Sequence, residues 1–367
     1  MLPNYISQLT DNGIGLDLEG YKANAIQYYL DERDSYLEEL SELLGTDVDL
    51  KDKLHVVQTF QSNGIILESM TQEYLKKRQN ERKEIFLLYK AKEYNQKLST
   101  YSVDKLTAHM DSCGRIHAEW YEATETTGRL TCRAPALQGF PSRCRQFFKP
   151  DEGYCFVTVD YSTIEMRVLA RLSGDKQLIK ELQKGGDIHR DTASAIFKKP
   201  PEAVTPEERQ MAKSVGFMIT YGGSAPGLAQ KLRNDGVNCT FAEAQNFIHS
   251  FYQKHPEVAY YHYQLKSGLV VPTTLMGRTF EGIRGSKALN YPVQASAAEG
   301  FKLTLSQIVE QMPSEYRLVM AIHDSISLEV PAAAKQEAEN FLKLSAESIM
   351  GQFLSPVPVF VEVKYSI

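Results

Sequence analysis

"VTVDYSTIEMRVLA", residues 157 to 170, joins a strand pattern to a helix pattern through a single aspartate. Apolar residues alternate over 156–159, which predicts a β-strand, and they recur at helical spacing over 164–169. Asp160 and Ser162 lie at the junction. Both residue types are good helix N-caps, and on this stretch alone a cap is the favoured interpretation of Asp160. The alternative is a carboxylate held at a strand end to bind a metal ion, which requires a second carboxylate.

Asp324 stands in the same kind of setting. Residues 317–330 form two apolar runs around a polar centre, which predicts a hairpin with Asp324 at its tip after His323. An aspartate in a turn is common, but these two strand ends can be neighbours in one antiparallel sheet. Two close carboxylates can bind two divalent ions about 3.5–4 Å apart, which supports in-line nucleotidyl transfer. Magnesium suits carboxylates combined with phosphate oxygens.

The composition is that of an ordinary globular protein, with 43% hydrophobic and 24% charged residues, and 367 residues allow two or three subdomains. A net charge of -5 gives no global support for nucleic-acid binding, so any such site must be a local patch. The five cysteines form no CxxC pair and match no zinc spacing. An odd number of cysteines without an export signal points to the cytoplasm or another reducing compartment. No apolar run approaches the roughly 20 residues of a membrane span.

Local patterns indicate helices and one basic loop. Residues 20–44 and 69–98 contain almost no Gly or Pro and predict two long, exposed helices, with the charge-dense segment 76–84 interpreted as a solvated helix face. Residues 174–265 read as mostly helical. Residues 129–149 carry five basic side chains and no acidic one, and their Pro and Gly content predicts a loop suited to phosphate contact.

A charged and aromatic stripe lies in "EERQMAKSVGFMITYGG", residues 207 to 223. Arg209, Lys213, Phe217 and Tyr221 recur every four residues, so they share one broad helix face roughly 18 Å long. A triphosphate could lie at the cationic end, with a base stacked near the aromatic end. The alternative is an amphipathic helix that buries Phe217 and Tyr221 in a core.

These segments together resemble family A DNA polymerases, the bacterial DNA polymerase I class. "DYSTIEMRVLA" is similar to motif A of that family, "RQMAKSVGFMITYG" to motif B and "AIHDSISLEV" to motif C. "TGRLTCRAPALQGFP" resembles its template–primer stretch, "DIHR" its triphosphate-contacting turn, and "NYPVQASAAEG" the helix before motif C. The resemblance implies an α+β right-hand fold with a palm built on an antiparallel sheet, helical fingers and a helical thumb.

The resemblance also implies a division of the chain. Residues 1–110 are expected to form an N-terminal lead-in and the thumb, and 111–173 the first part of the palm with the template–primer loop and motif A. Residues 174–280 are expected to form the fingers, and 281–367 the second part of the palm with motif C. Because the thumb-like region begins almost at the first residue, we expect no 3′–5′ proofreading activity in this chain.

The family's functional residues carry over by motif. The implied metal ligands are Asp160, the backbone carbonyl of Tyr161, and Asp324, and the implied catalytic residues are Asp160, Asp324 and Lys213. The implied dNTP contacts are Arg209, Lys213, Phe217, Tyr221, His189 and Glu165. The implied DNA contacts are Arg129, Arg143, Asn290, Gln294 and His323.

Glu165 matches the steric gate that rejects a ribose 2′-hydroxyl, held by a hydrogen bond from Tyr221. The alternative is a surface glutamate without substrate contact, the usual environment of this residue type. The chain departs from the family pattern at Ser325, where Glu is usual, and at Gly216, Met218 and Gly139. None of these positions is a metal ligand.

The leading hypothesis is therefore a magnesium-dependent, DNA-templated DNA polymerase that uses two ions, with Mn²⁺ as a substitute. Its expected partners are primer–template DNA and dNTPs; we expect a monomer with no membrane attachment. One alternative is a single-subunit RNA polymerase-like enzyme, which Glu165 argues against. Another is a catalytically silent nucleic-acid-binding protein, which has no need of the two aspartates.

Overall fold

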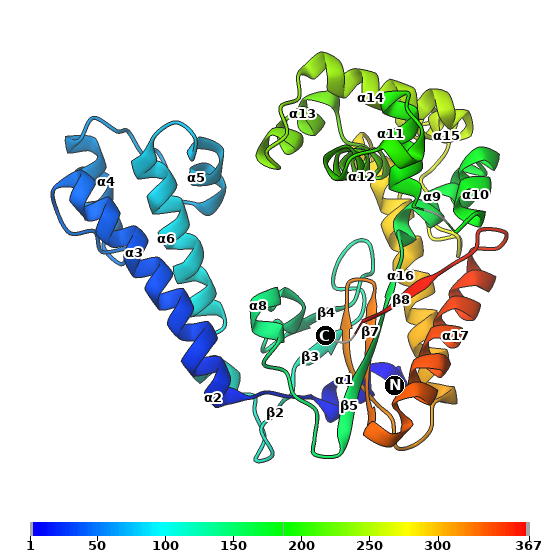
Figure 1. The fold of residues 1–367 in the computed structure, drawn as a ribbon, viewed down its shortest axis with the longest axis horizontal. Coiled ribbons are helices and arrows are strands. Elements are labelled where there is room, and N and C mark those ends of the chain that lie inside the picture. Colours follow the sequence, from blue (N-terminus) through cyan, green and yellow to red (C-terminus); the bar gives the residue numbers. More distant parts are fainter. Residues whose placement is uncertain (1–2, 186, 365–367) are drawn as a thin grey trace. The chain divides into compact units, whose positions relative to one another are not determined.

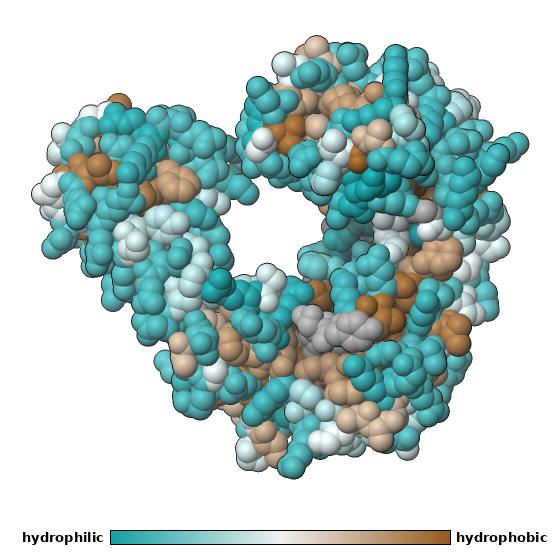
Figure 2. All heavy atoms as spheres, viewed as in Figure 1, coloured by the Kyte–Doolittle hydropathy of each residue, from teal (hydrophilic) through white to brown (hydrophobic). Residues whose placement is uncertain are grey.

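The computed structural model describes residues 3–185 and 187–364, which divide between two compact units (Figure 1). Unit 1 comprises residues 1–12, 120–131 and 152–367. Unit 2 comprises residues 13–119 and 132–151. Both units are discontinuous in sequence. Hydrophilic residues cover most of the face of each unit seen in Figure 2.

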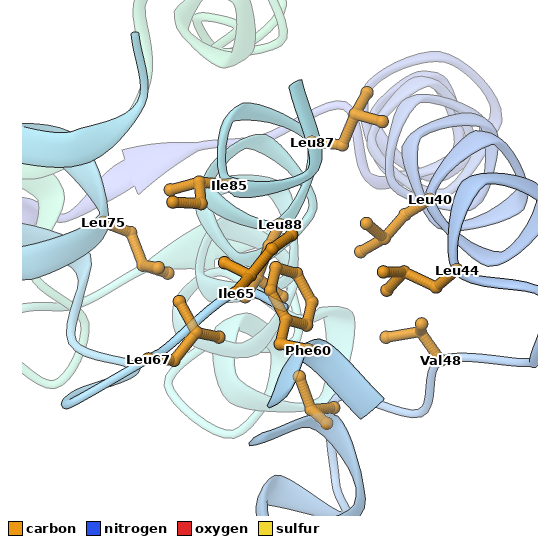
Figure 3. Packing of buried hydrophobic residues seen from close by; sticks show 11 residues of the cluster. Leu40, Leu44, Val48, Phe60, Ile65, Leu67, Leu75, Ile85, Leu87 and Leu88 are labelled. Carbon is orange, nitrogen blue, oxygen red and sulfur yellow. The ribbon is translucent and has the colours of Figure 1, made fainter. Parts of the chain in front are cut away.

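Unit 2 is built on two long helices, α3 (Gln27–Leu44) and α6 (Lys83–Thr100), which pack against each other (Figure 1). Two shorter helices, α4 (Lys53–Ser62) and α5 (Gln72–Arg78), complete one end. Leucine, isoleucine, valine and phenylalanine side chains meet there in a buried cluster (Figure 3). The labelled members are Leu40, Leu44, Val48, Phe60, Ile65, Leu67, Leu75, Ile85, Leu87 and Leu88. This cluster gives unit 2 a hydrophobic core of its own.

The remaining elements of unit 2 are short. They are β1 (Ile14–Gly15) paired with β2 (Arg115–Ile116), α2 (Leu18–Gly20), a π-helical segment (Tyr21–Ile26), α7 (Val103–Thr107), a 3₁₀ turn (Leu137–Gly139) and α8 (Ser142–Arg145). The predicted helix over 20–44 is present, with the π-helical segment inside its first half. The basic segment 129–149 is mostly irregular, as expected.

The prediction of a single helix over 69–98 is wrong, because the helix is interrupted between the end of α5 at Arg78 and the start of α6 at Lys83. Arg82 has an extended backbone, with φ -148°, and serves as the N-cap of α6. Arg78 pairs with Glu81 at 2.7 Å and Arg82 with Glu84 at 2.8 Å across this turn. Exposed charged side chains can be hydrated or paired in a turn as well as on a helix. A charge-dense sequence therefore does not by itself predict that a helix continues without interruption. The second helix is also less exposed than predicted, since it buries Leu87 and Leu88.

Unit 1 contains a four-stranded antiparallel sheet in the order β6–β7–β5–β8. Its strands are β5 (Tyr154–Tyr161), β6 (Arg317–Ile322), β7 (Ser325–Pro331) and β8 (Val361–Lys364). The predicted hairpin over 317–330 is confirmed as β6 and β7. The strand predicted over 357–365 begins later, at Val361, and Tyr365 lies outside the described residues.

The two faces of this sheet differ in polarity because side chains alternate along each strand. Val157 lies opposite Leu328 and Val159 opposite Ile326, and all four are buried. The helix α17 (Lys335–Phe353) packs along β5 and β8 (Figure 1). The Tyr161 hydroxyl donates to the Ala346 carbonyl of α17 at 3.0 Å.

The opposite face of the sheet is polar. The register pairs Thr158 with Ser327 and Asp160 with Ser325. Across β8, Asp160 lies opposite Glu362. Asp160 therefore lies on the polar face of β5. The opposite face of the same strand packs in the core through Val157 and Val159.

Helices make up the rest of unit 1. They are α1 (Asn4–Asn12), α9 (Ile164–Ser173), α10 (Lys176–Gln183), α11 (Ile188–Phe197), a 3₁₀ turn (Pro201–Ala203), α12 (Pro206–Thr220), α13 (Ala225–Asn234), α14 (Phe241–Lys254), α15 (Pro256–Ser267), α16 (Ser286–Gln311) and a 3₁₀ turn (Ala332–Ala334). Two short strands, β3 (Glu119–Tyr121) and β4 (Thr131–Arg133), lie where the chain passes from one unit to the other. The helical prediction for 174–265 is confirmed. Within the described ranges, no helix has a stretch both long and apolar enough to cross a bilayer.

Candidate active site

The two aspartates singled out in the sequence come together at neighbouring strand ends. Asp160 lies near the end of β5, directly opposite Ser325, the first residue of β7. The backbone N–H of Tyr161 donates to the carbonyl of Asp324 at 3.1 Å. The adjacency expected from the strand patterns is thus present in the sheet.

The N-cap interpretation of Asp160 is wrong. The helix α9 begins at Ile164, and its N-cap residue is Thr163, which adopts a left-handed backbone with φ 52° and makes no side-chain cap. Ser162 also does not cap the helix, because its hydroxyl donates to Glu362 Oε1 at 3.1 Å. Two turn residues, Ser162 and Thr163, therefore separate the end of β5 from the helix, and the Asp160 carboxylate is not used as a helix cap.

Negative charge is concentrated around Asp324. Burial, together with the nearby carboxylates of Glu165 and Asp160, raises the pKa of Asp324 to about 6, while Arg129 and Lys364 oppose the shift. A buried carboxylate beside like charges is stabilised by a cation. Oxygen donors of this kind are those that Mg²⁺ prefers, so the residues present fit a magnesium site.

Protein side chains supply only part of a coordination sphere here. Over residues 3–185 and 187–364, no group of three or more His, Cys, Asp or Glu side chains is arranged to hold a metal ion. Mg²⁺ usually retains several waters and binds through one or two carboxylates together with substrate phosphates. The pair Asp160 and Asp324 suits that mode of binding.

Both oxygens of the Asp160 carboxylate have partners within the chain. Ser325 Oγ donates to Oδ1 at 2.8 Å, and Lys364 Nζ forms an ion pair with Oδ2. Sequence reasoning found Ser325 only as a departure from the family pattern, and it missed Lys364 and Glu362. The alternation in "VEVK", residues 361–364, was a usable signal, because it places two charged residues on one face of a strand.

The helix α12 carries the predicted cationic and aromatic stripe. It begins with a capping box, in which Thr205 and Glu208 bond each other's backbone N–H groups. Arg209 forms an ion pair with Asp187, the N-cap of α11. Lys213 is exposed. The pKa of His189 is lowered to about 4, chiefly by burial and also by Lys213 and Arg209, so its imidazole is neutral at pH 7.

The aromatic end of the stripe is partly open to solvent. Phe217 is 51% exposed. Its ring centroid lies 4.3 Å from that of Tyr221, which follows the last residue of α12. The alternative that placed Phe217 in a core is therefore wrong, and its ring can receive a flat partner.

Glu165 projects from the first turn of α9 into a polar cluster. Arg129 donates to its carboxylate, and the Tyr221 hydroxyl is also hydrogen-bonded to it. Its side chain is only 14% exposed, and burial raises the pKa of Glu165 while Tyr221 and Arg129 lower it in part. The surface interpretation of Glu165 is wrong, and the expected hydrogen bond to Tyr221 is present.

An open pocket of about 350 Å³ in unit 1 brings most of these groups together. The predicted site residues that line it are Asp160, Tyr161, Glu165, His189, Arg209, Lys213, Phe217 and Asp324. Tyr221 and Arg129 are not among the lining residues, but both contact Glu165, which is. The pocket therefore joins the acidic strand ends to the cationic helix face.

The other predicted DNA contacts lie outside the pocket lining. Asn290 and Gln294 are on α16, and His323, with φ 52°, precedes Asp324 in the β6–β7 turn. The side-chain nitrogen of Asn290 is buried and has no hydrogen-bond partner among the described residues. Arg143 belongs to unit 2, where its guanidinium carbon lies 3.7 Å from the centroid of the Tyr28 ring.

The family model described as DNA polymerase family A matches residues 35–366, nearly the whole chain. The chain belongs to DNA polymerase family A. It is 37% identical over 274 residues to the thermostable DNA polymerase I of Thermus aquaticus, covering 68% of this chain and 32% of that protein. It is 33% identical over 267 residues to DNA polymerase I of Aquifex aeolicus, covering 70% of this chain and 46% of that protein. The matched region thus spans about a third to a half of these relatives.

A solved family A structure shows a similar fold. It is the POL domain of Pol1 from M. smegmatis in complex with DNA primer-template and dNTP. The likeness has a TM-score of 0.81 at 25% identity and covers 99% of this chain and 68% of the other. The predicted α+β right-hand polymerase class is confirmed.

Two departures from the usual family A pattern have a steric explanation. A Cβ atom on Gly216 would lie 2.9 Å from Cε of Met166, and one on Gly139 would lie 2.6 Å from the hydroxyl of Tyr101. A larger side chain at either position would have to displace its neighbour. Each glycine makes room for a bulky partner that this chain carries.

Proposed function

We propose that this chain is a polymerase domain that extends the 3′ end of a DNA primer with dNTPs, directed by a DNA template. The observation that carries the proposal is the shared pocket. The carboxylates of Asp160 and Asp324 border the same cavity as Arg209, Lys213 and Phe217. An acidic, metal-binding end and a cationic, aromatic wall are what a nucleoside triphosphate requires.

Asp160, Asp324 and the backbone carbonyl of Tyr161 are the groups that would hold two Mg²⁺ ions, with Mn²⁺ as a substitute. When bound, such ions would lower the pKa of the primer hydroxyl and offset the negative charge of the leaving pyrophosphate. Arg209 and Lys213 bind the triphosphate through charge-assisted contacts. Arg209 exchanges its ion pair with Asp187 for one with the nucleotide.

The remaining pocket residues orient the nucleotide. His189 is neutral at pH 7, so it donates a hydrogen bond to a phosphate oxygen without adding charge. The half-exposed ring of Phe217 stacks on the base. Glu165, fixed by Arg129 and Tyr221, fills the space beside C2′ of the sugar, so a ribose hydroxyl clashes with it.

DNA is held through groups that do not distinguish base pairs. A template-copying enzyme must accept every sequence, so it contacts phosphates and the minor-groove acceptors that all base pairs share. Asn290, Gln294 and Arg129 are donors suited to those acceptors, and the amide nitrogen of Asn290, which has no hydrogen-bond partner among residues 3–185 and 187–364, supports this role. The basic segment 129–149, which includes Arg143, contacts the phosphate backbone. His323 lies next to Asp324, where the primer end would be.

The domain assignment follows the family pattern. The thumb with its lead-in comprises residues 1–110, the palm 111–173 and 281–367, and the fingers 174–280.

We assign no 3′–5′ proofreading to these residues and propose that the chain acts as a monomer in a reducing compartment such as the cytoplasm. The five cysteines, Cys113, Cys132, Cys144, Cys155 and Cys239, form no disulfide within the chain, which fits a reducing compartment.

A primer-extension assay tests the proposal. The full chain should extend a labelled primer with dNTPs and Mg²⁺, poorly with rNTPs, and not at all in EDTA. Efficient extension with rNTPs would favour the RNA polymerase-like alternative. Primer–template binding without extension under any divalent metal would favour the catalytically silent alternative.

A further inference from the structure

We infer that Lys364 is a tethered cation that competes with divalent metal ions for the Asp160 carboxylate and thereby lowers the metal affinity of the site. This inference rests on the proposed function, since it takes Asp160 to be a metal ligand. It assigns a role to a residue that no motif of the chain includes.

The register of the sheet places Lys364 beside the carboxylate. In the β5–β8 ladder, Glu362 is opposite Asp160 and Lys364 is opposite Thr158. Residues two apart on a strand share a face, so Lys364 and Asp160 are diagonal neighbours on the polar side. Lys364 Nζ closes the contact by pairing with Oδ2 of Asp160.

The two partners of Asp160 differ in how they affect an incoming ion. Ser325 is neutral and donates one hydrogen bond to Oδ1, which leaves a lone pair on that oxygen free. The ammonium group of Lys364 contacts Oδ2 and carries a full positive charge. A divalent ion bound at the same carboxylate would be repelled by that ammonium group. A metal ion can therefore bind Oδ1 while Ser325 keeps its hydrogen bond. The same ion must displace the ammonium group of Lys364 from Oδ2.

Displacement is feasible because Lys364 is at the surface. Its side chain is 44% exposed, and that of Asp160 is 30% exposed. Glu362, on the same face two residues away, offers the ammonium group a second carboxylate after it leaves Asp160. An exposed ion pair is weak enough to exchange, so the expected effect is moderate.

If Lys364 positioned Asp160 for metal binding instead of competing with the metal ion, removing its charge would change the metal affinity in the opposite direction. The charged groups around this end of the pocket are the carboxylates of Asp160, Asp324, Glu165 and Glu362 and the cations Lys364, Arg129, Arg209 and Lys213. If Lys364 instead held Asp160 in the orientation that metal binding needs, its removal would weaken metal binding. The direction of the change therefore separates a competitor from a positioning residue.

The test is direct titration with Mn²⁺, using the electron paramagnetic resonance signal of the free ion and the full chain without DNA or nucleotide. Lys364→Met keeps the length of the side chain and removes its charge. We expect the Mn²⁺ dissociation constant to fall roughly three- to tenfold. Lys343→Met, at an exposed position on α17, changes the net charge equally and should match the wild type. Lys364→Arg should bind no more tightly than the wild type.

Thermal unfolding in EDTA shows whether each variant is folded. If Lys364→Met does not fold, Lys364→Gln takes its place with the same expectation. Unchanged or weaker Mn²⁺ binding in a folded, uncharged variant, relative to Lys343→Met, overturns the inference. Asp160→Asn distinguishes this failure from failure of the proposed function: if it binds Mn²⁺ like the wild type, Asp160 is not a metal ligand and both proposals fail.

Discussion

Ser325 lies directly across the β5–β7 ladder from Asp160 and donates a 2.8 Å hydrogen bond to its Oδ1. Family A polymerases usually carry a glutamate at this position, so here a short neutral side chain replaces a carboxylate beside the proposed metal site. The hydroxyl holds Asp160 without adding negative charge. At this position of β7 the proposed site therefore has a hydrogen-bond donor to Asp160 in place of a third carboxylate.

Replacing either aspartate should stop catalysis. Asp160→Asn or Asp324→Asn keeps the side-chain shape but removes a charged oxygen ligand, so primer extension should fall by at least about a thousandfold. Binding of primer–template should survive, because phosphate contacts do not depend on these groups. Gel-shift and extension assays on the same preparations measure both, and extension near the wild-type rate in either variant would contradict the assignment.

Lys213→Ala should mainly impair use of the incoming nucleotide. Its charge contacts phosphates most strongly in the transition state, so kcat/KM for dNTP should fall by roughly a hundredfold. Lys231→Ala on α13, whose exposed partner is Asp235, serves as the control and should have little effect. Steady-state kinetics that show unchanged kcat/KM in Lys213→Ala would remove this residue from the phosphate site.

Glu165→Ala should relax sugar selection. Removing the side chain opens space at C2′, so the ratio of kcat/KM for rNTP to that for dNTP should rise by at least about tenfold. Overall activity should also drop, since Arg129 and Tyr221 lose their shared partner. Glu165→Gln keeps the bulk without the charge and should retain most of the discrimination. A ratio that stays at the wild-type value in Glu165→Ala would reopen the RNA polymerase-like alternative.

His262 should make unit 1 sensitive to acid. Burial, with a smaller effect of Lys266, lowers the pKa of His262 to about 4 in the folded chain, against 6.5 for a free imidazole. Between these values the unfolded chain binds a proton that the folded chain does not, so stability falls as the pH falls from 6.5 toward 4. At pH 5 the contribution of His262 to the loss should be about 2 kcal/mol relative to pH 7.5, and His189, whose pKa is also lowered to about 4, adds to the loss over the same pH range.

Urea unfolding at the two pH values measures this effect. His262→Gln should lose less stability on acidification than the wild type, while the exposed His249→Gln should behave like the wild type. Equal acid sensitivity in wild type and His262→Gln would show that this imidazole is not the group responsible.

Arg143→Ala should weaken DNA binding without changing its sequence preference. A lost phosphate contact lowers affinity equally on unrelated duplexes and makes the salt dependence shallower by about one unit of log–log slope. Arg143→Lys keeps the charge and should retain most of that slope. An affinity loss confined to one duplex sequence would argue for base recognition instead.

The sequence predicted much of the site because its chemistry is local. The strand before Asp160, the hairpin around Asp324 and the stripe on α12 are each contained within about twenty residues, and each is present. Their adjacency could be expected, because antiparallel strands bring such ends together.

Other contacts could not be read from local patterns. Lys364 reaches Asp160 only through the register of β8, which is set by pairing between strands about two hundred residues apart. The pairing of Arg209 with Asp187 depends on how α11 and α12 pack. The cap interpretation of Asp160 was wrong for a related reason: cap preference ranks residue types, whereas the helix start was set by the turn at Thr163.

The position of β8 at one edge of the sheet bears on how the protein is made. Asp160 is synthesised about two hundred residues before Val361–Lys364, the strand that pairs with it. Until that segment emerges from the ribosome, β5 has an unpaired edge, and unpaired edges readily associate with other chains. A nascent chain stalled before Val361 would thus hold both aspartates but expose a β-strand edge, and should be a target for chaperones.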